Sequence, residues 1–212
     1  MKKNIQTAIF LMIVLCSSMH AQSFEGTIEI KKSTPIDTSI YVYYVSNNHV
    51  RIDEIGNRSN KVEGSFIMDL DAKTIKTLNH SRKLYMDQPS PAVTEIKGKC
   101  EVKKMRSIKN IQGYKCAEYI VTNPEENTMI SYWIADGKFS FFEKMLRQLN
   151  RKDKSSIYYL QIENIKNMSP MLSTQKTLDG KNEVVLEVTK IVEKKIVPSM
   201  FEIPKGYNKF DK

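Results

Sequence analysis

Few residues of this 212-residue chain have the side chains and spacing from which catalytic or metal sites are built. His49 and His80 both stand at predicted turns and lack metal-ligand spacing. Asp53 and Glu54 are neighbours on a predicted strand, where successive side chains point to opposite faces, and Asp71 is a natural turn residue. The sequence contains no hydrolase nucleophile elbow, phosphate-binding loop or zinc-peptidase motif. It therefore predicts a non-enzymatic protein without a metal or another cofactor.

Cys100 and Cys116 allow two interpretations. In an oxidising compartment the pair can form one disulfide. However, a hairpin that turns near residues 110–113 places Cys116 nearer Ser107 than Cys100, so a bridge requires a bulge or a non-neighbouring strand. A metal site is the weaker interpretation, because no histidine lies near either cysteine in the sequence. The pattern leaves the disulfide open.

The residues best suited to bind a ligand are apolar and recur at helical spacing. They are Phe141, Phe142, Met145, Leu146 and Leu149. Their ordinary role is packing against a sheet, but the same face can also line a pocket for an apolar ligand. Arg51 can pair with a lipid head group or face solvent, and Trp133 shares a strand face with Met129 and Ser131. The predicted ligand-binding set consists of the five apolar residues together with Trp133 and Arg51.

These side chains must be positioned by a predicted sheet. Short alternating segments separated by Asn, Asp and Ser run from Thr27 to Asp87 and predict an antiparallel meander. The strand at residues 40–45 is apolar on both faces, so a further layer must cover the sheet's second face. Further strands are expected at residues 100–108, 114–122 and 128–135, before a closing hairpin of residues 173–178 and 184–192.

One helix is predicted at about residues 141–151, where the apolar period changes. Ser140 is the expected N-cap, with Glu143 completing a capping box. The run at residues 157–165 fits either a strand or a second helix. The fold class is therefore mainly β, with one large antiparallel sheet and one or two helices.

The segment Met1–Ala21 has the pattern of a secretion signal. Two lysines precede an apolar run that is too short to span a bilayer. We expect cleavage after Ala21 and a single domain over residues 22–212. Cys16 raises the alternative of a lipid anchor, which is weaker because Leu15 is larger than the residue that lipoprotein signals place there.

The chain carries a net charge of +9. Its charges are scattered and not grouped in blocks, which is typical of a solvated surface and also suits peripheral contact with an anionic envelope membrane. Secretion argues against a nucleic-acid partner. The sequence does not predict an oligomeric state.

The stretch Val197-Pro198-Ser199-Met200-Phe201-Glu202-Ile203-Pro204-Lys205-Gly206-Tyr207 resembles the C-terminal signature of a family of secreted bacterial proteins of unknown function. That family is placed near the LolA/LppX-like lipoprotein-carrier superfamily. Three other stretches are similar to its pattern: residues 49–53, residues 66–70 followed by Leu84-Tyr85, and residues 111–116 with Trp133 downstream.

The resemblance implies a strongly curved antiparallel sheet, or half-barrel, with one or two helices on its concave face. The hollow of such a sheet can hold acyl chains. The expected function is that of a periplasmic or secreted protein that binds a lipid or a lipoprotein acyl chain. The alternative is a structural or protein-interaction module of the cell envelope with a fully packed interior.

Overall fold

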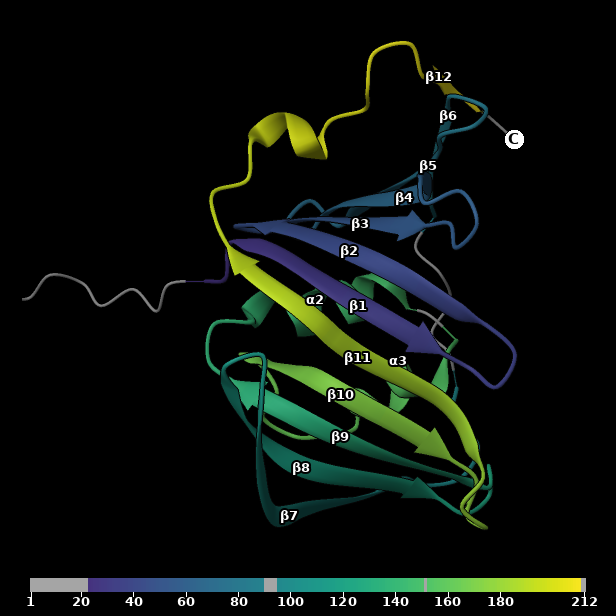
Figure 1. Ribbon diagram of the computed structural model, residues 1–212, viewed down its shortest axis with the longest axis vertical. Coiled ribbons are helices and arrows are strands. Elements are labelled where there is room, and N and C mark those ends of the chain that lie inside the picture. The colour runs from purple at the N-terminus through teal and green to yellow at the C-terminus, as the bar shows by residue number, and fades with distance from the viewer. Residues whose placement is uncertain (1–22, 90–94, 151, 211–212) are drawn as a thin grey trace, which may run out of the picture.

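The computed structural model describes residues 23–89, 95–150 and 152–210. Within them, one twelve-stranded sheet has the order β12-β6-β5-β4-β3-β2-β1-β11-β10-β9-β8-β7. Neighbouring strands are antiparallel, except that β12 runs parallel to β6. The sheet is curved and open, and its two helices lie together behind it in Figure 1. The predicted fold class is confirmed.

The first half of the sheet is the predicted meander, in which six strands follow one another through tight turns. They are β1 (Gly26–Ser33), β2 (Thr38–Ser46), β3 (His49–Ile55), β4 (Val62–Asp69), β5 (Thr74–Asn79) and β6 (Leu84–Asp87). Alternating apolar residues place one face of each strand against the core. Gly26 sits where the Val192 carbonyl leaves no space for a side chain, so this position requires glycine.

The second half combines five strands with the helices. Its elements are β7 (Glu101–Ile111), β8 (Tyr114–Asn123), β9 (Thr128–Asp136), α2 (Ser140–Leu149), α3 (Lys154–Tyr159), β10 (Met168–Lys176) and β11 (Asn182–Glu193). Pairing of β1 with β11 joins the two halves in the middle of the sheet. The run at residues 157–165, which the sequence left open between strand and helix, begins in the last turn of α3.

The start of α2 differs from the prediction. Ser140 is its first helical residue, while Phe139 occupies the capping position and no side chain caps the helix. Phe139 is fully buried against the ring of Phe24, so core packing determines where this helix begins. By contrast, α3 does have a side-chain cap, because the Asp153 carboxylate accepts a hydrogen bond from the Ser156 amide.

The main core lies between the concave face of the sheet and the two helices. Its largest fully buried side chains include Phe24, Ile52, Met68, Ile130, Tyr132, Phe139, Met145, Tyr158, Tyr159 and Met171. Residues opposite one another in the ladder share a face, so the concave side can be followed from strand to strand through the register.

The convex face of β2–β6 carries a second layer, which we call the C-terminal segment (residues 197–210). It contains the 3₁₀-helix η1 (Pro198–Phe201) and ends in β12 (Asn208–Lys209), at the top of Figure 1. The strand at residues 40–45, apolar on both faces, predicted such a covering layer.

Two sequence-based predictions concern the membrane. The proposed signal segment, Met1–Ala21, lies outside the described residues. In the part of the chain that the structure does describe, neither helix is long and apolar enough to cross a bilayer.

Candidate functional site

An apolar cavity of about 100 Å³ lies between the concave face of the sheet and the two helices. Strands β1, β2, β9, β10 and β11 form its floor, and α2 and α3 form its roof. Buried side chains, such as Tyr132, Phe142 and Val188, make its inner end. Half-exposed side chains, including Lys32 and Asp153, make its outer end. The lining is thus mainly apolar, and Lys32 and Asp153 are its two charged residues.

Three of the five predicted stripe residues line this cavity. They are Phe142, Leu146 and Leu149, which α2 presents toward β10 and β11. Phe141 and Met145 are fully buried and pack in the core, where the ring of Phe141 contacts that of Phe142. The helical stripe is therefore divided between the cavity wall and the packed core.

The structure corrects the placement of Trp133 and Arg51, because both point to the convex face. Trp133 follows the cavity-lining Tyr132 on β9, so the pleat turns its side chain away, and the Lys109 ammonium lies 5.7 Å from its ring centre. Arg51 belongs instead to a buried polar network beneath the C-terminal segment.

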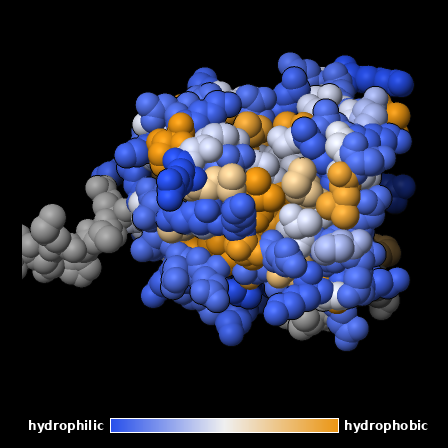
Figure 2. All heavy atoms as spheres, turned by 90° about the horizontal axis from the view of Figure 1, so that it is seen from below, coloured by the Kyte–Doolittle hydropathy of each residue, from blue (hydrophilic) through white to orange (hydrophobic). Residues whose placement is uncertain are grey.

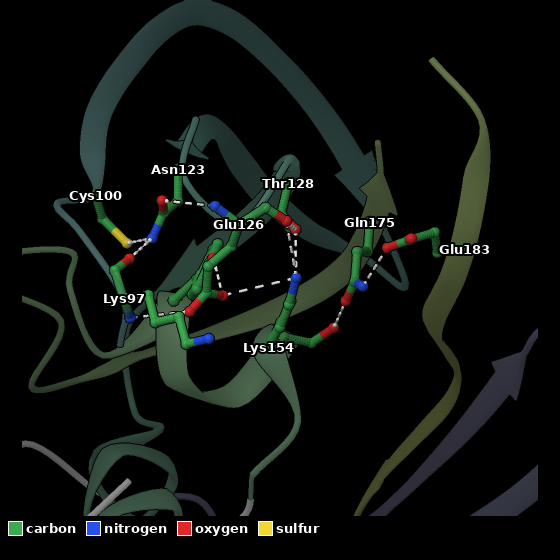
Figure 3. Close-up of polar contacts among 10 residues, drawn as sticks. Lys97, Cys100, Asn123, Glu126, Thr128, Lys154, Gln175 and Glu183 are labelled. Carbon is green, nitrogen blue, oxygen red and sulfur yellow. Dashed lines mark hydrogen bonds and ion pairs between the residues drawn. The ribbon is translucent and has the colours of Figure 1, made fainter. Parts of the chain in front are cut away.

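Hydrogen bonds at the turn between β8 and β9 hold α3 in place (Figure 3). The Tyr158 hydroxyl donates to Glu126 Oε2 at 2.5 Å, and this bond is the main reason why the pKa of Glu126 is lowered. Lys154 Nζ donates to Thr128 Oγ1 at 2.6 Å and to the Glu126 carbonyl at 3.1 Å. Helix α3 is thus fixed to the sheet by charged and hydrogen-bonded groups.

A second set of bonds continues along the cavity wall. Tyr132 donates to the Ser155 carbonyl at 2.7 Å, and Ser155 Oγ donates to Gln175 Oε1 at 3.4 Å. Gln175 Nε2 in turn donates to Glu183 at 2.6 Å, as Figure 3 shows. The α2 side chains that line the cavity are apolar and have no such bonds. Elsewhere on α2, Gln148 donates to the Asp69 and Thr74 carbonyls at 3.2 and 2.8 Å, so only the cavity-lining side of α2 is held by apolar packing alone.

The two cysteines are free thiols: Cys116 lies near the start of β8, and Cys100 lies beside Asn123 at its end. Cys116 pairs across the ladder with Lys109, whereas Cys100 precedes β7 and lies 3.8 Å from the Asn123 amide nitrogen. Roughly 20 Å of strand separates these positions, which is too far for a disulfide. The disulfide interpretation is therefore wrong.

Burial raises the pKa of both thiols, so each favours the protonated, weakly nucleophilic form. Among the described residues, no three His, Cys, Asp or Glu side chains form a group that could hold a metal ion.

A buried polar network lies under the C-terminal segment, on the convex face. Arg51 Nε donates to Asp53 Oδ1 at 2.6 Å and Arg51 Nη1 donates to the Met200 carbonyl at 3.2 Å. Ser65 Oγ donates to Asp53 at 2.5 Å and lies 2.6 Å from His80 Nε2. We call these residues, together with Tyr207, the clamp network.

The clamp network has one consistent arrangement of protons. Because the Ser65 hydroxyl hydrogen is directed to Asp53, His80 Nε2 must donate to Ser65 Oγ, and His80 Nδ1 must accept from the Tyr207 hydroxyl 2.6 Å away. Desolvation, and next the Arg51 charge, lower the pKa of His80 and favour this neutral ring. Ser65 is 1% exposed and does not donate to the histidine, so the pair is not arranged as a hydrolytic nucleophile and base.

Sequence reasoning did not identify this network. Its members come from β3, β4, the turn after β5 and the C-terminal segment, and they share no local spacing. The available signal was Arg51 and Asp53, which alternate with the apolar Val50 and Ile52 on β3, but a solvent-facing position was the commoner expectation for the arginine.

The free edge of the sheet at β7 is basic and exposed. Lys103, Lys104, Arg106 and Lys109 accompany the exposed apolar residues Val102 (41%) and Ile108 (54%). Figure 2 views the molecule from below, where β7 and β8 lie, and shows apolar side chains gathered in a hollowed centre within a hydrophilic rim. The pairing of β7 with β8 is interrupted between Lys104 and Ile108. Lysines and an irregular ladder are features that protect an edge from uncontrolled strand pairing.

Comparisons with solved structures give three similarities. An uncharacterized conserved protein from Thermus thermophilus is similar with a TM-score of 0.56 and 7% identity, over 96% of this chain and 98% of that one. PNGF-II gives a TM-score of 0.48 and 10% identity, over 88% of this chain and 30% of that one. A putative outer membrane lipoprotein-sorting protein domain from Vibrio parahaemolyticus gives a TM-score of 0.33 and 6% identity, over 83% of this chain and 87% of that one.

At these identities the likeness concerns the fold alone. No curated protein matches the sequence. Residues 24–207 match the profile described as "Domain of unknown function (DUF4412)", which confirms the predicted resemblance to a family of unknown function. This match spans nearly all of the described residues, and the chain therefore belongs to the DUF4412 family.

Proposed function

We propose that this protein binds an apolar ligand, a lipid or an acyl group, in the cavity between its curved sheet and α2. The observation that carries the proposal is the cavity itself, whose lining is mainly apolar and includes two half-exposed charged residues. Each buried methylene of an acyl chain contributes about 0.8 kcal/mol to binding.

The size of the cavity defines how a ligand would enter. In another protein, an apolar cavity of about 150 Å³ binds benzene, so about 100 Å³ suits a segment of a few carbon atoms. A longer chain must displace Leu146 and Leu149 on α2, which are held by apolar contacts, while α3 stays bonded to the sheet. The proposal is thus a site that widens on its α2 side.

We place this activity in the bacterial envelope, as a non-enzymatic carrier or receptor. The secretion pattern of Met1–Ala21 supports the location. An acylated lipoprotein segment and a free lipid are both suitable partners, since each presents an acyl chain.

The test is native mass spectrometry of the protein purified from an envelope fraction, followed by titration with a fluorescent fatty acid. Co-purified lipid and saturable uptake are expected. Leu146→Glu should abolish uptake because it places a charge in the cavity, and Leu149→Glu should do so with less effect on stability. Leu178→Glu, at a position 45% exposed, is the matched control.

The rival function is an interaction module that uses the free β7 edge, and the exposed Val102 and Ile108 favour it. A clean apo mass with no fatty-acid uptake by the wild-type protein would support this rival over the lipid site. If Leu146→Glu and Leu149→Glu change only the thermal stability, the stripe serves packing and the proposed site is refuted.

A further inference from the structure

We propose that Lys32 binds the anionic head group of the ligand, so that the cavity selects acyl chains ending in a carboxylate or a phosphate over neutral or cationic amphiphiles. This inference rests on the proposed function and specifies its ligand class.

The register of the sheet places Lys32 on the cavity side. It is the penultimate residue of β1 and pairs with Leu186 on β11, which lines the cavity. Lys32 itself also lines the cavity and is half-buried. Its neighbour Lys31 pairs with Glu187 and is exposed on the opposite face. Of these two adjacent lysines, one therefore faces the cavity and the other faces away.

Lys32 has no ion pair or hydrogen bond to another side chain among the described residues. The other charged residue of the lining is Asp153, whose carboxylate accepts from the Ser156 amide at 3.0 Å and from Ser156 Oγ at 3.1 Å. These donors are neutral, so the carboxylate keeps its negative charge while it caps α3. The lining thus carries one cation and one anion, and among the described residues the Lys32 ammonium forms no ion pair with Asp153 or with any other carboxylate.

Three uncharged polar side chains of the lining already have partners. Ser155 donates to Gln175, Gln175 donates to Glu183, and the Tyr159 hydroxyl donates to the Met168 carbonyl at 3.0 Å. A ligand head group at the mouth therefore meets the Lys32 ammonium as the available charged donor. Because a half-buried ammonium is partly desolvated, an anion there gains a charge-assisted hydrogen bond.

The geometry matches a single-chain amphiphile. Its hydrocarbon occupies the inner end near Phe142 and Val188, and its head group lies at the outer end near Lys32. The flexible stem of lysine lets the ammonium follow head groups of different size while the chain remains buried.

The test uses four ten-carbon probes, namely decanoate, decyl phosphate, decanol and decylamine, titrated by calorimetry at about pH 8. The wild-type protein should bind the anions about tenfold more tightly than decanol, on the scale of one charge-assisted hydrogen bond. Whichever anion binds more tightly, decanoate or decyl phosphate, shows whether the site prefers a carboxylate or a phosphate head group. Lys32→Met should reduce anion affinity to that of decanol and leave decanol binding unchanged.

Two further variants make the result specific. Lys32→Glu should reverse the preference toward decylamine, and Lys31→Met, the matched control on the other face, should bind all four probes as the wild type does. Equal anion binding by wild type and Lys32→Met overturns the proposal while the cavity function stands. Loss of decanol binding in Lys32→Met also overturns it, because the lysine stem then acts by packing. If the wild type binds none of the probes, the proposed function itself fails.

Discussion

On its concave face the sheet is covered by α3, which is hydrogen-bonded to it, and by α2, whose cavity-lining side chains are apolar, and a cavity remains between sheet and helices. On its convex face the C-terminal segment is held by directional bonds, from Arg51 to Met200 and from Tyr207 to His80. Apolar contacts depend on area and not on direction, so the α2 side can repack around a guest. Hydrogen bonds of the clamp network have fixed geometry, so the convex side specifies a single arrangement. The protein thus combines an adaptable face with a fixed one.

The largest effect should follow from opening the clamp network at its buried ion pair. Arg51 is 9% exposed and Asp53 is 3% exposed, so Arg51→Ala leaves a buried carboxylate without its cation. We expect a loss of about 3–5 kcal/mol in the free energy of unfolding, measured by urea denaturation. The exposed Arg58→Ala is the control and should change stability by less than about 0.5 kcal/mol. Similar values for the two variants would show that the convex face is not fixed by this pair.

The second effect tests the concave face. Met145 is fully buried, so Met145→Ala should cost about 2–5 kcal/mol in denaturant unfolding. Leu149 is half-buried and already borders the cavity, so Leu149→Ala removes fewer contacts and should cost less. Equal losses at the two positions would contradict an adaptable α2 surface on the cavity side.

A smaller effect is expected where the C-terminal segment reaches the network. Tyr207→Phe removes the hydroxyl that donates to His80 Nδ1 and should cost about 0.5–1.5 kcal/mol. Tyr85→Phe is the control, because among the described residues its hydroxyl has no hydrogen-bond partner. Hydrogen exchange of the Asn208 and Phe210 amides, which bond to β6 and the turn before it, would report any local release.

The smallest effect is a pH dependence, since His80 is only partly buried and solvent screens its charge. Its pKa is lowered from 6.5, so the folded state binds this proton less readily than the unfolded state. The contribution of His80 is therefore present above about pH 6.5 and is lost as the pH falls through the folded pKa.

Melting temperatures of the wild type and His80→Gln, compared between about pH 7.5 and 5.5, isolate this contribution. The wild type should lose more stability over that range. Carboxylates with a lowered pKa, such as Glu126, lose their contribution to stability only at more acidic pH, so they do not affect the comparison of the two proteins between about pH 7.5 and 5.5. Identical slopes would mean that the clamp network tolerates a charged ring.

Local patterns were sufficient to predict the strands and the main helix. The alternation of Phe66, Met68 and Leu70, for example, reflects a periodicity that any half-buried strand shows. The doubly apolar strand at residues 40–45 also predicted the covering layer on the convex face. These features depend on short stretches of chain, so the sequence contains them directly.

The features that the sequence did not predict depend on contacts between residues far apart in the chain. Nothing near Arg51 in the sequence indicates that the Met200 carbonyl will accept a hydrogen bond from its guanidinium. The side chain of Trp133 is of a type that suits an apolar ligand, yet the pleat of the strand turns it away from the cavity. Ser140 had the right residue type for a cap, yet burial of Phe139 shifted the helix start. Lys31 and Lys32 look alike in sequence, and only the register with β11 separates their faces.

The central pairing of β1 with β11 has a consequence for the order of assembly. Gly26 lies opposite Glu193, so these two strands cannot meet until the chain has been made as far as β11 and, if exported, has crossed the membrane to that point. Before then, β1–β6 and β7–β10 exist as two separate meanders with unpaired borders, and closing so long a loop is slow. Maturation of this protein should therefore end at the middle of its sheet, and the partly folded halves are the species that most need protection from aggregation.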